Sequence, residues 1–191
     1  MRILKLTKET QDNILENLLK RSPNSYGEFE DRVNEIIQNV RDRRDEAIFE
    51  YTLKFDGAKI DHSNIEVTEQ EIEEAYKEVD PKLLEVIRKA LVNIRDYHMK
   101  QKQYSWFDSD ESGIMLGQKV TPLKTVGVYV PGGKAVYPSS VLMNVIPAKV
   151  AGVDHIVMTT PCGRDGKVYP STLVAAKEAG VDRIFKVGGA Q

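Results

Sequence analysis

Residues 126–133 read Val-Gly-Val-Tyr-Val-Pro-Gly-Gly and decide the fold. A short run of apolar, mostly β-branched residues that ends in Pro and two Gly is typical of a strand followed by a tight loop. No charged residue interrupts the apolar run, which indicates a strand of a parallel sheet rather than a half-exposed antiparallel one. The chain downstream repeats this pattern.

Helix and strand patterns alternate through the rest of the chain. The expected elements after this strand are a helix at 138–150, a strand at 155–160, a helix at 169–179 and a strand at 183–187. Pro147 predicts a kink or an early end in the first helix, and Gly180 is expected to end the second in the left-handed conformation. Strand–helix–strand–helix–strand predicts an α/β fold: a βαβαβ half of a parallel sheet with right-handed crossovers.

The first part of the chain is predicted to be mainly helical. Apolar residues recur at helical spacing over 7–20 and again from Phe29 until Phe55-Asp56-Gly57 stops the pattern. Thr68-Glu69-Gln70-Glu71 has the sequence of a capping box, which predicts a helix start. Asp80-Pro81 predicts another start, with Asp as N-cap and Pro at the first helical position.

Charge and composition divide the chain in the same way. Of its 191 residues 41% are hydrophobic, and 27 basic against 29 acidic residues give a net charge of −2. Residues 1–118 carry a net charge of −7 and residues 119–191 a net charge of +5. We therefore predict two domains, a mainly helical region at 1–118 and the βαβαβ region at 119–191. The balanced total gives no electrostatic reason to expect a nucleic-acid or membrane partner.

The single cysteine and the hydrophobic pattern point to a reducing compartment. Cys162 alone excludes an internal disulfide and any multi-cysteine metal site. No apolar run approaches the roughly 20 residues that a membrane span needs, and residues 1–19 lack the features of a secretory signal. A cytoplasmic location is the expectation.

Two glycine-containing loops are the candidate binding elements. Ligands of open parallel sheets bind beyond the carboxyl ends of the strands, and residues 129–134 and 188–191 both follow strands there. Their glycines can turn N–H groups toward a phosphate, with Lys134 nearby, or they can simply form tight turns. Neither loop has the spacing of G-x-G-x-x-G or of a P-loop. From the residues alone, both interpretations stay open.

Several stretches together resemble the histidinol dehydrogenase family. The most specific are Val126–Gly133, Tyr137–Asn144, Pro147–Val153 and Val187–Gln191; weaker matches are Val40-Arg41, Glu50–Gly57, Asn93-Ile94 and Gln101. The resemblance spans nearly the whole chain. It implies an incomplete Rossmann-like βαβαβ half-sheet after an amino-terminal helical region. It also implies a homodimeric, zinc-containing enzyme that uses NAD to oxidise L-histidinol to L-histidine through the aldehyde, in histidine biosynthesis.

The resemblance assigns two cofactor contacts to this chain. The family's NAD-binding Tyr and Gln fall on Tyr129 and Gln191, a ring that can pack on the adenosine part and an amide that can donate and accept hydrogen bonds. The family is longer than 191 residues, and its zinc ligands and acid–base pair lie in the part that follows. We therefore expect no catalytic residue and no metal ligand within this chain, and an inactive fragment.

Other residues with reactive side chains receive structural interpretations. His62, His98 and His155 lie in unrelated elements, so surface or structural roles are expected for them. Cys162 has no histidine or other base beside it in the sequence and is expected to be inert. Two alternatives of another class remain, a stand-alone module that binds a nucleotide through the glycine loops and a dimerisation module that uses the charged helices.

Overall fold

The structure is a computed structural model that describes residues 7, 8, 10, 27–132 and 136–189. Most of the predicted helix at 7–20 therefore lies outside the described residues. The chain divides into two units, Met1–Arg43 and Arg44–Gln191. The first contains α2 (Gly27–Arg43). The second contains α3 (Asp45–Asp56), α4 (Glu69–Glu78), α5 (Pro81–Met99), β1 (Trp106–Ser109), β2 (Met115–Gln118), β3 (Thr125–Tyr129), α6 (Pro138–Ala151), β4 (His155–Thr160), α7 (Pro170–Ala179) and β5 (Arg183–Lys186).

The helical stretch after Phe29 is broken once, at a position the sequence does not mark. Arg44 has a φ of 53°, in the left-handed region, and separates α2 from α3. The expectation of one continuous helical pattern is wrong here, because neither Gly nor Pro signals the break. The predicted end is confirmed: Gly57 adopts a φ of 70° and donates its N–H to the carbonyl of Leu53.

Both predicted helix starts in the second unit are confirmed. The hydroxyl of Thr68 accepts the N–H of Glu71 at 3.2 Å, and the Glu71 carboxylate accepts the N–H of Thr68 at 2.8 Å, completing the capping box of α4. Asp80 caps α5 by accepting the N–H of Lys82 at 2.8 Å, with Pro81 at the first helical position. These side chains satisfy amides that would otherwise lack intrahelical partners.

The predicted parallel half-sheet is present. β3, β4 and β5 lie in that order and pair in parallel, with Val128 opposite Met158 and Met158 opposite Ile184. The expected early end at Pro147 is wrong, since α6 continues to Ala151. Val145 and Ile146, directly before this proline, are fully buried, so packing against the core retains the helix despite the missing N–H.

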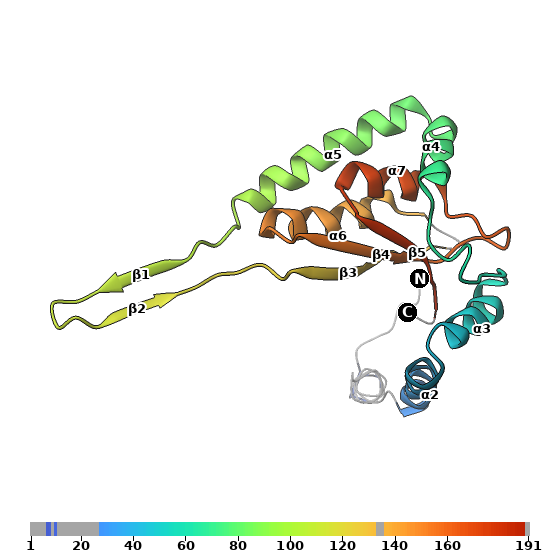
Figure 1. Ribbon diagram of the computed structural model, residues 1–191, viewed down its shortest axis with the longest axis horizontal. Coiled ribbons are helices and arrows are strands. Elements are labelled where there is room, and N and C mark those ends of the chain that lie inside the picture. Colours follow the sequence, from blue (N-terminus) through green and yellow to red (C-terminus); the bar gives the residue numbers. More distant parts are fainter. Residues whose placement is uncertain (1–6, 9, 11–26, 133–135, 190–191) are drawn as a thin grey trace. The chain divides into compact units, whose positions relative to one another are not determined.

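The helices cover one face of this sheet. α6 packs against α7, α5 packs against α6, and α4 packs against α7. Figure 1 shows the sheet, then α6 and α7, then α5 as successive layers of the second unit. Ile156, Met158 and Ile184 point from the strands into the core beneath α6 and α7. The outer edge of β5 is paired briefly with residues 65–67, because Val67 donates its N–H to Ile184 and Lys186 donates its N–H to Ile65.

A β-hairpin follows α5 and was not expected from the sequence. β1 and β2 pair in antiparallel register, with Trp106 opposite Gln118 and Ser109 opposite Met115. All residues of both strands are exposed. Neither strand alternates apolar and polar residues, so the sequence pattern does not predict them. The division into domains at residue 118 stays a prediction. Among the described helices, none is long and apolar enough to cross a membrane.

A partly exposed hydrogen-bond network joins α4, α5 and α7. The Tyr76 hydroxyl donates to Glu178 Oε1 at 2.8 Å, and Arg88 donates to both carboxylate oxygens of Glu178 at 2.9 Å. The hydrogen bonds from Arg88, opposed by burial, hold the pKa of the Glu178 carboxyl below its usual range. Burial, together with the hydrogen bond to Glu178, raises the pKa of Tyr76 to about 12. The Glu178 carboxylate thereby connects α7 to both α4 and α5 by hydrogen bonds.

We predict that Glu178→Gln lowers the free energy of unfolding by about 1–3 kcal/mol at pH 7, because charge-assisted hydrogen bonds are lost. The folded pKa of Glu178 is depressed, so its stabilising effect is present above the unfolded-state pKa and lost as the pH falls through the folded value. The difference between the two proteins should therefore shrink in acid. Urea unfolding followed by circular dichroism measures this. Glu73→Gln, at an exposed position, is the control; equal effects of both changes would contradict the prediction.

Candidate functional site

The candidate site is the carboxyl rim, which we define as residues 129–132, 159–162 and 185–189, where the three parallel strands end. The register places Tyr129 opposite Thr159 and Thr159 opposite Phe185. Partners in a parallel register point to the same face, so these three side chains form one row across the sheet. The row lies on the face opposite α6 and α7, because the neighbouring row of Val128, Met158 and Ile184 joins the core beneath those helices.

Tyr129 is accessible at this rim. Tyr129 is the last residue of β3, and its side chain is 37% exposed. Val130, the residue that follows the strand, is fully buried. Two residues earlier on the same face, a Cβ added to Gly127 would meet no described atom within 4 Å. The aromatic ring thus stands beside an open stretch of β3, on which the flat part of a ligand can lie.

Pro161 fixes the spacing between the two glycine loops. A Cβ on Gly132 would lie 2.8 Å from Pro161 Cγ, and a Cβ on Gly188 would lie 2.8 Å from Pro161 Cβ. Neither glycine has a positive φ, so turn geometry does not require them. Glycine is needed at both positions because the backbone after β3 and after β5 packs directly against Pro161, the residue that follows β4.

Asp56 reaches the rim from the end of α3. A Cβ on Gly188 would lie 2.5 Å from Asp56 Oδ2, so this oxygen is packed against the glycine backbone. Oδ2 is buried and has no hydrogen-bond partner among the described residues. Burial raises the pKa of the Asp56 carboxyl. A carboxylate at the carboxyl terminus of a helix also interacts unfavourably with the helix dipole. The charged form of Asp56 therefore destabilises the folded protein at this position.

The charge of Asp56 also raises the pKa of two other groups of the rim, Tyr129 and Cys162. Burial, followed by the Asp56 charge, raises the pKa of Tyr129 and keeps its phenol able to donate a hydrogen bond. The same two causes, in the same order, raise the pKa of the Cys162 thiol, which is itself buried. A thiol with a raised pKa is a poor nucleophile, in agreement with the expectation that Cys162 is inert.

The sequence predicts Tyr129 as a site residue, and this stays a prediction; the sequence does not point to Asp56, Pro161 or Phe185. Phe55-Asp56-Gly57 predicts a helix end and belongs to a weaker family match, and neither observation assigns Asp56 to the site. The signal that was available is the sign of the charge, because the last turn of a helix favours basic residues and Asp56 is acidic. Phe185 could have been found by counting the strand register from Tyr129, once the three strands were taken as parallel.

Part of the predicted site lies outside the described residues. Gly133, Lys134 and Gln191 belong to that part, so the predicted approach of Gln191 to Tyr129 stays a prediction. In the described portion of the chain, no group of three His, Cys, Asp or Glu side chains could hold a metal ion. His62 lies 3.7 Å from both Asp45 and Glu46 at an exposed position, away from the rim.

Comparison with known proteins agrees with the family suggested by the rim sequence. The sequence model of the family described as histidinol dehydrogenase matches residues 19–191. The chain belongs to the histidinol dehydrogenase family. Histidinol dehydrogenase of Heliobacterium mobile is 56% identical over 160 residues, which cover 84% of this chain and 38% of that protein. The enzyme of Geobacillus kaustophilus is 56% identical over 174 residues, covering 91% of this chain and 41% of that protein.

A solved structure extends the likeness to three dimensions. The crystal structure of histidinol dehydrogenase from Elizabethkingia anophelis superposes with a TM-score of 0.79 at 33% identity, covering 85% of this chain and 37% of that chain. The α/β fold with its three-stranded parallel sheet is therefore that of a histidinol dehydrogenase. The chain spans about two fifths of the length of the curated relatives it matches.

We predict that Gly188→Ala lowers the free energy of unfolding by about 1–3 kcal/mol, because the new methyl group collides with Asp56 and Pro161. Gly127→Ala is the matched control, since its methyl group meets no described atom and the change should cost less than about 0.5 kcal/mol. Urea unfolding of the three proteins gives both values. Equal losses for the two variants would show that the rim is not closely packed.

Proposed function

We propose that this chain is the amino-terminal, cofactor-binding part of an NAD-dependent, zinc-containing histidinol dehydrogenase. The whole enzyme would oxidise L-histidinol through the aldehyde to L-histidine, as an oxidoreductase of histidine biosynthesis. The relatives, which are histidinol dehydrogenases, support the substrate, and the exposed ring of Tyr129 at the end of a parallel strand supports the cofactor. The proposal includes a cytoplasmic, homodimeric protein.

The described rim fits a dinucleotide in two respects. Tyr129 offers an accessible ring next to the uncovered surface at Gly127. Asp56 Oδ2 is a buried acceptor without a partner among the described residues, and a hydroxyl or N–H donor brought to the rim would stabilise it. NAD supplies the hydride acceptor when it is bound. The residues of this chain would contribute binding and orientation, with Tyr129 and Gln191 as the proposed contacts.

The catalytic groups are proposed to lie in the rest of the enzyme. Zinc ligands and the acid–base pair are expected in the carboxyl-terminal part of the longer protein. The chain alone should therefore form no NADH from L-histidinol, and an absorbance assay at 340 nm tests this. Sustained turnover by the 191-residue chain would overturn this part of the proposal. NAD binding by a longer protein that does not oxidise histidinol would favour the alternative, a nucleotide-binding module.

We predict that Tyr129→Ala weakens NAD binding by this chain about tenfold, since the loss of an aromatic contact costs about 1.4 kcal/mol. Isothermal titration calorimetry of NAD into the purified chain measures the dissociation constant. Tyr97→Ala is the control, because Tyr97 is 62% exposed on α5, outside the rim. An unchanged dissociation constant for Tyr129→Ala would place the cofactor elsewhere.

A further inference from the structure

Asp56 brings to the carboxyl rim a carboxylate oxygen that lacks a hydrogen-bond donor in the described part of the chain. This oxygen, Oδ2, is buried, while the residue as a whole is half-buried. A buried carboxylate without a donor costs free energy, and a donor from a bound molecule removes part of that cost. The side chain is therefore suited to recognising a ligand that carries a hydroxyl or an N–H group.

The last turn of α3 fixes the position of this carboxylate. A Cβ on Gly188 would lie 2.5 Å from Asp56 Oδ2. A Cβ on Gly189 would lie 3.0 Å from Phe55 Cδ2. Two neighbouring residues of the helix thus pack on two neighbouring glycines of the loop after β5. Contacts with backbone leave the carboxylate little freedom, which is the condition for selective binding.

The carboxylate also lies within electrostatic range of the aromatic ring that is proposed to contact the adenosine of NAD. After burial, the charge of Asp56 is the next cause of the raised pKa of Tyr129. Tyr129 is 37% exposed, so its ring is open to a ligand at the same rim. In an adenosine the ribose is bonded directly to the base, and its hydroxyls are donors that a carboxylate accepts. The ribose is therefore the part of NAD best suited to meet Asp56.

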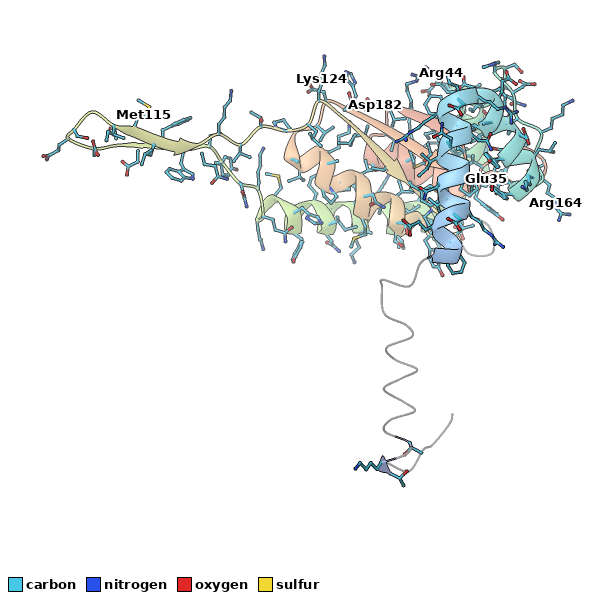
Figure 2. All side chains as sticks on the ribbon, turned by 90° about the horizontal axis from the view of Figure 1, so that it is seen from below. Glu35, Arg44, Met115, Lys124, Arg164 and Asp182 are labelled. Atoms are coloured by element: carbon cyan, nitrogen blue, oxygen red, sulfur yellow. The ribbon has the colours of Figure 1, made fainter. Side chains whose placement is uncertain are left out.

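No described cation neutralises the charge of Asp56. Burial is the sole cause of its raised pKa, and no described Lys or Arg opposes this shift. The ammonium of Lys186 is held by the Glu71 carboxylate at 2.6 Å. Arg164 is exposed, and Figure 2 shows it at the outer margin of the second unit. A ligand at the rim therefore meets a negative charge without a described counter-ion beside it.

We propose that Asp56 accepts a hydrogen bond from the adenosine 2′-hydroxyl of NAD and thereby selects NAD over NADP. The inference rests on the proposed function, because it takes NAD to bind at the rim. NADP carries a phosphate at this hydroxyl, so it offers the carboxylate no donor and brings further negative charge toward it. Acidic residues make this distinction in Rossmann-type sheets, whereas an arginine accommodates the 2′-phosphate of NADP.

The position of Asp56 in the chain differs from that of the usual ribose-binding acid. In a Rossmann-type fold this acidic residue follows the glycine-rich turn by about 20 residues. Asp56 belongs to α3, which precedes all three strands of the parallel sheet. The packing of α3 on the loop after β5, rather than the βαβ connection, brings the carboxylate to the rim.

Isothermal titration calorimetry with three probes tests the inference: NAD, NADP, and NAD whose adenosine lacks the 2′-hydroxyl (2′-deoxy-NAD). We expect the unaltered chain to bind NADP and 2′-deoxy-NAD at least about tenfold more weakly than NAD. Asp56→Asn should weaken NAD binding and reduce both preferences to about twofold or less. Asp56→Glu keeps the charge and should keep the preference for NAD over NADP.

Asp165→Asn is the matched control, because it makes the same chemical change in the exposed loop after β4. There the Asp165 carboxylate accepts the N–H of Lys167 at 3.1 Å. Both preferences should be unchanged in this variant. A control that lost them equally would show a general effect of net charge and would overturn the assignment to Asp56.

The remaining outcomes separate this inference from the proposed function. If the unaltered chain binds none of the three probes, NAD binding itself is refuted. If it binds NAD and 2′-deoxy-NAD equally well, the inference is overturned without recourse to any variant, and the proposed function stands. Asp56→Asn that weakens all three probes by the same factor would assign Asp56 a structural role and would also overturn the inference.

Discussion

Pro161 packs between Gly132 and Gly188, and this contact holds the ends of β3, β4 and β5 at one level. Any larger side chain at either glycine would push two neighbouring strand ends apart. Because the strands are parallel and in register, their alignment places Tyr129, Thr159 and Phe185 in one row on the face opposite α6 and α7. The candidate cofactor surface is therefore a consequence of packing at the strand ends.

The placement of the Asp56 carboxylate at this rim is energetically unfavourable for the folded protein. Its Oδ2 is buried without a described partner, its pKa is raised by burial, and it lies at the negative end of α3. Residues of this kind are often found at functional sites, where a bound group offsets the local destabilisation. The position of Asp56 against Gly188 links the helical segment before it to the sheet edge where the cofactor is proposed to bind.

Local signals in the sequence are sufficient to predict the parallel sheet and the helix caps. Continuous apolar strands, the Thr68–Glu71 capping box and the glycine at 180 each have a physical cause confined to a few residues. The persistence of α6 through Pro147 and the approach of Asp56 to Gly188 depend on contacts distant in sequence, which local patterns do not contain. The break at Arg44 is marked by neither Gly nor Pro. The hairpin was missed because its apolar residues are exposed on both faces.

The most direct test of the rim as the cofactor surface is an NMR titration of the isotope-labelled chain with NAD. We expect the amide signals of the non-proline residues in 127–132, 159–162 and 185–189 to shift with a common saturation curve, while those of α4 and α5 stay in place. Shifts confined to the loop at residues 163–169 or to the hairpin, with an unmoved rim, would contradict the assignment of the cofactor to these strand ends.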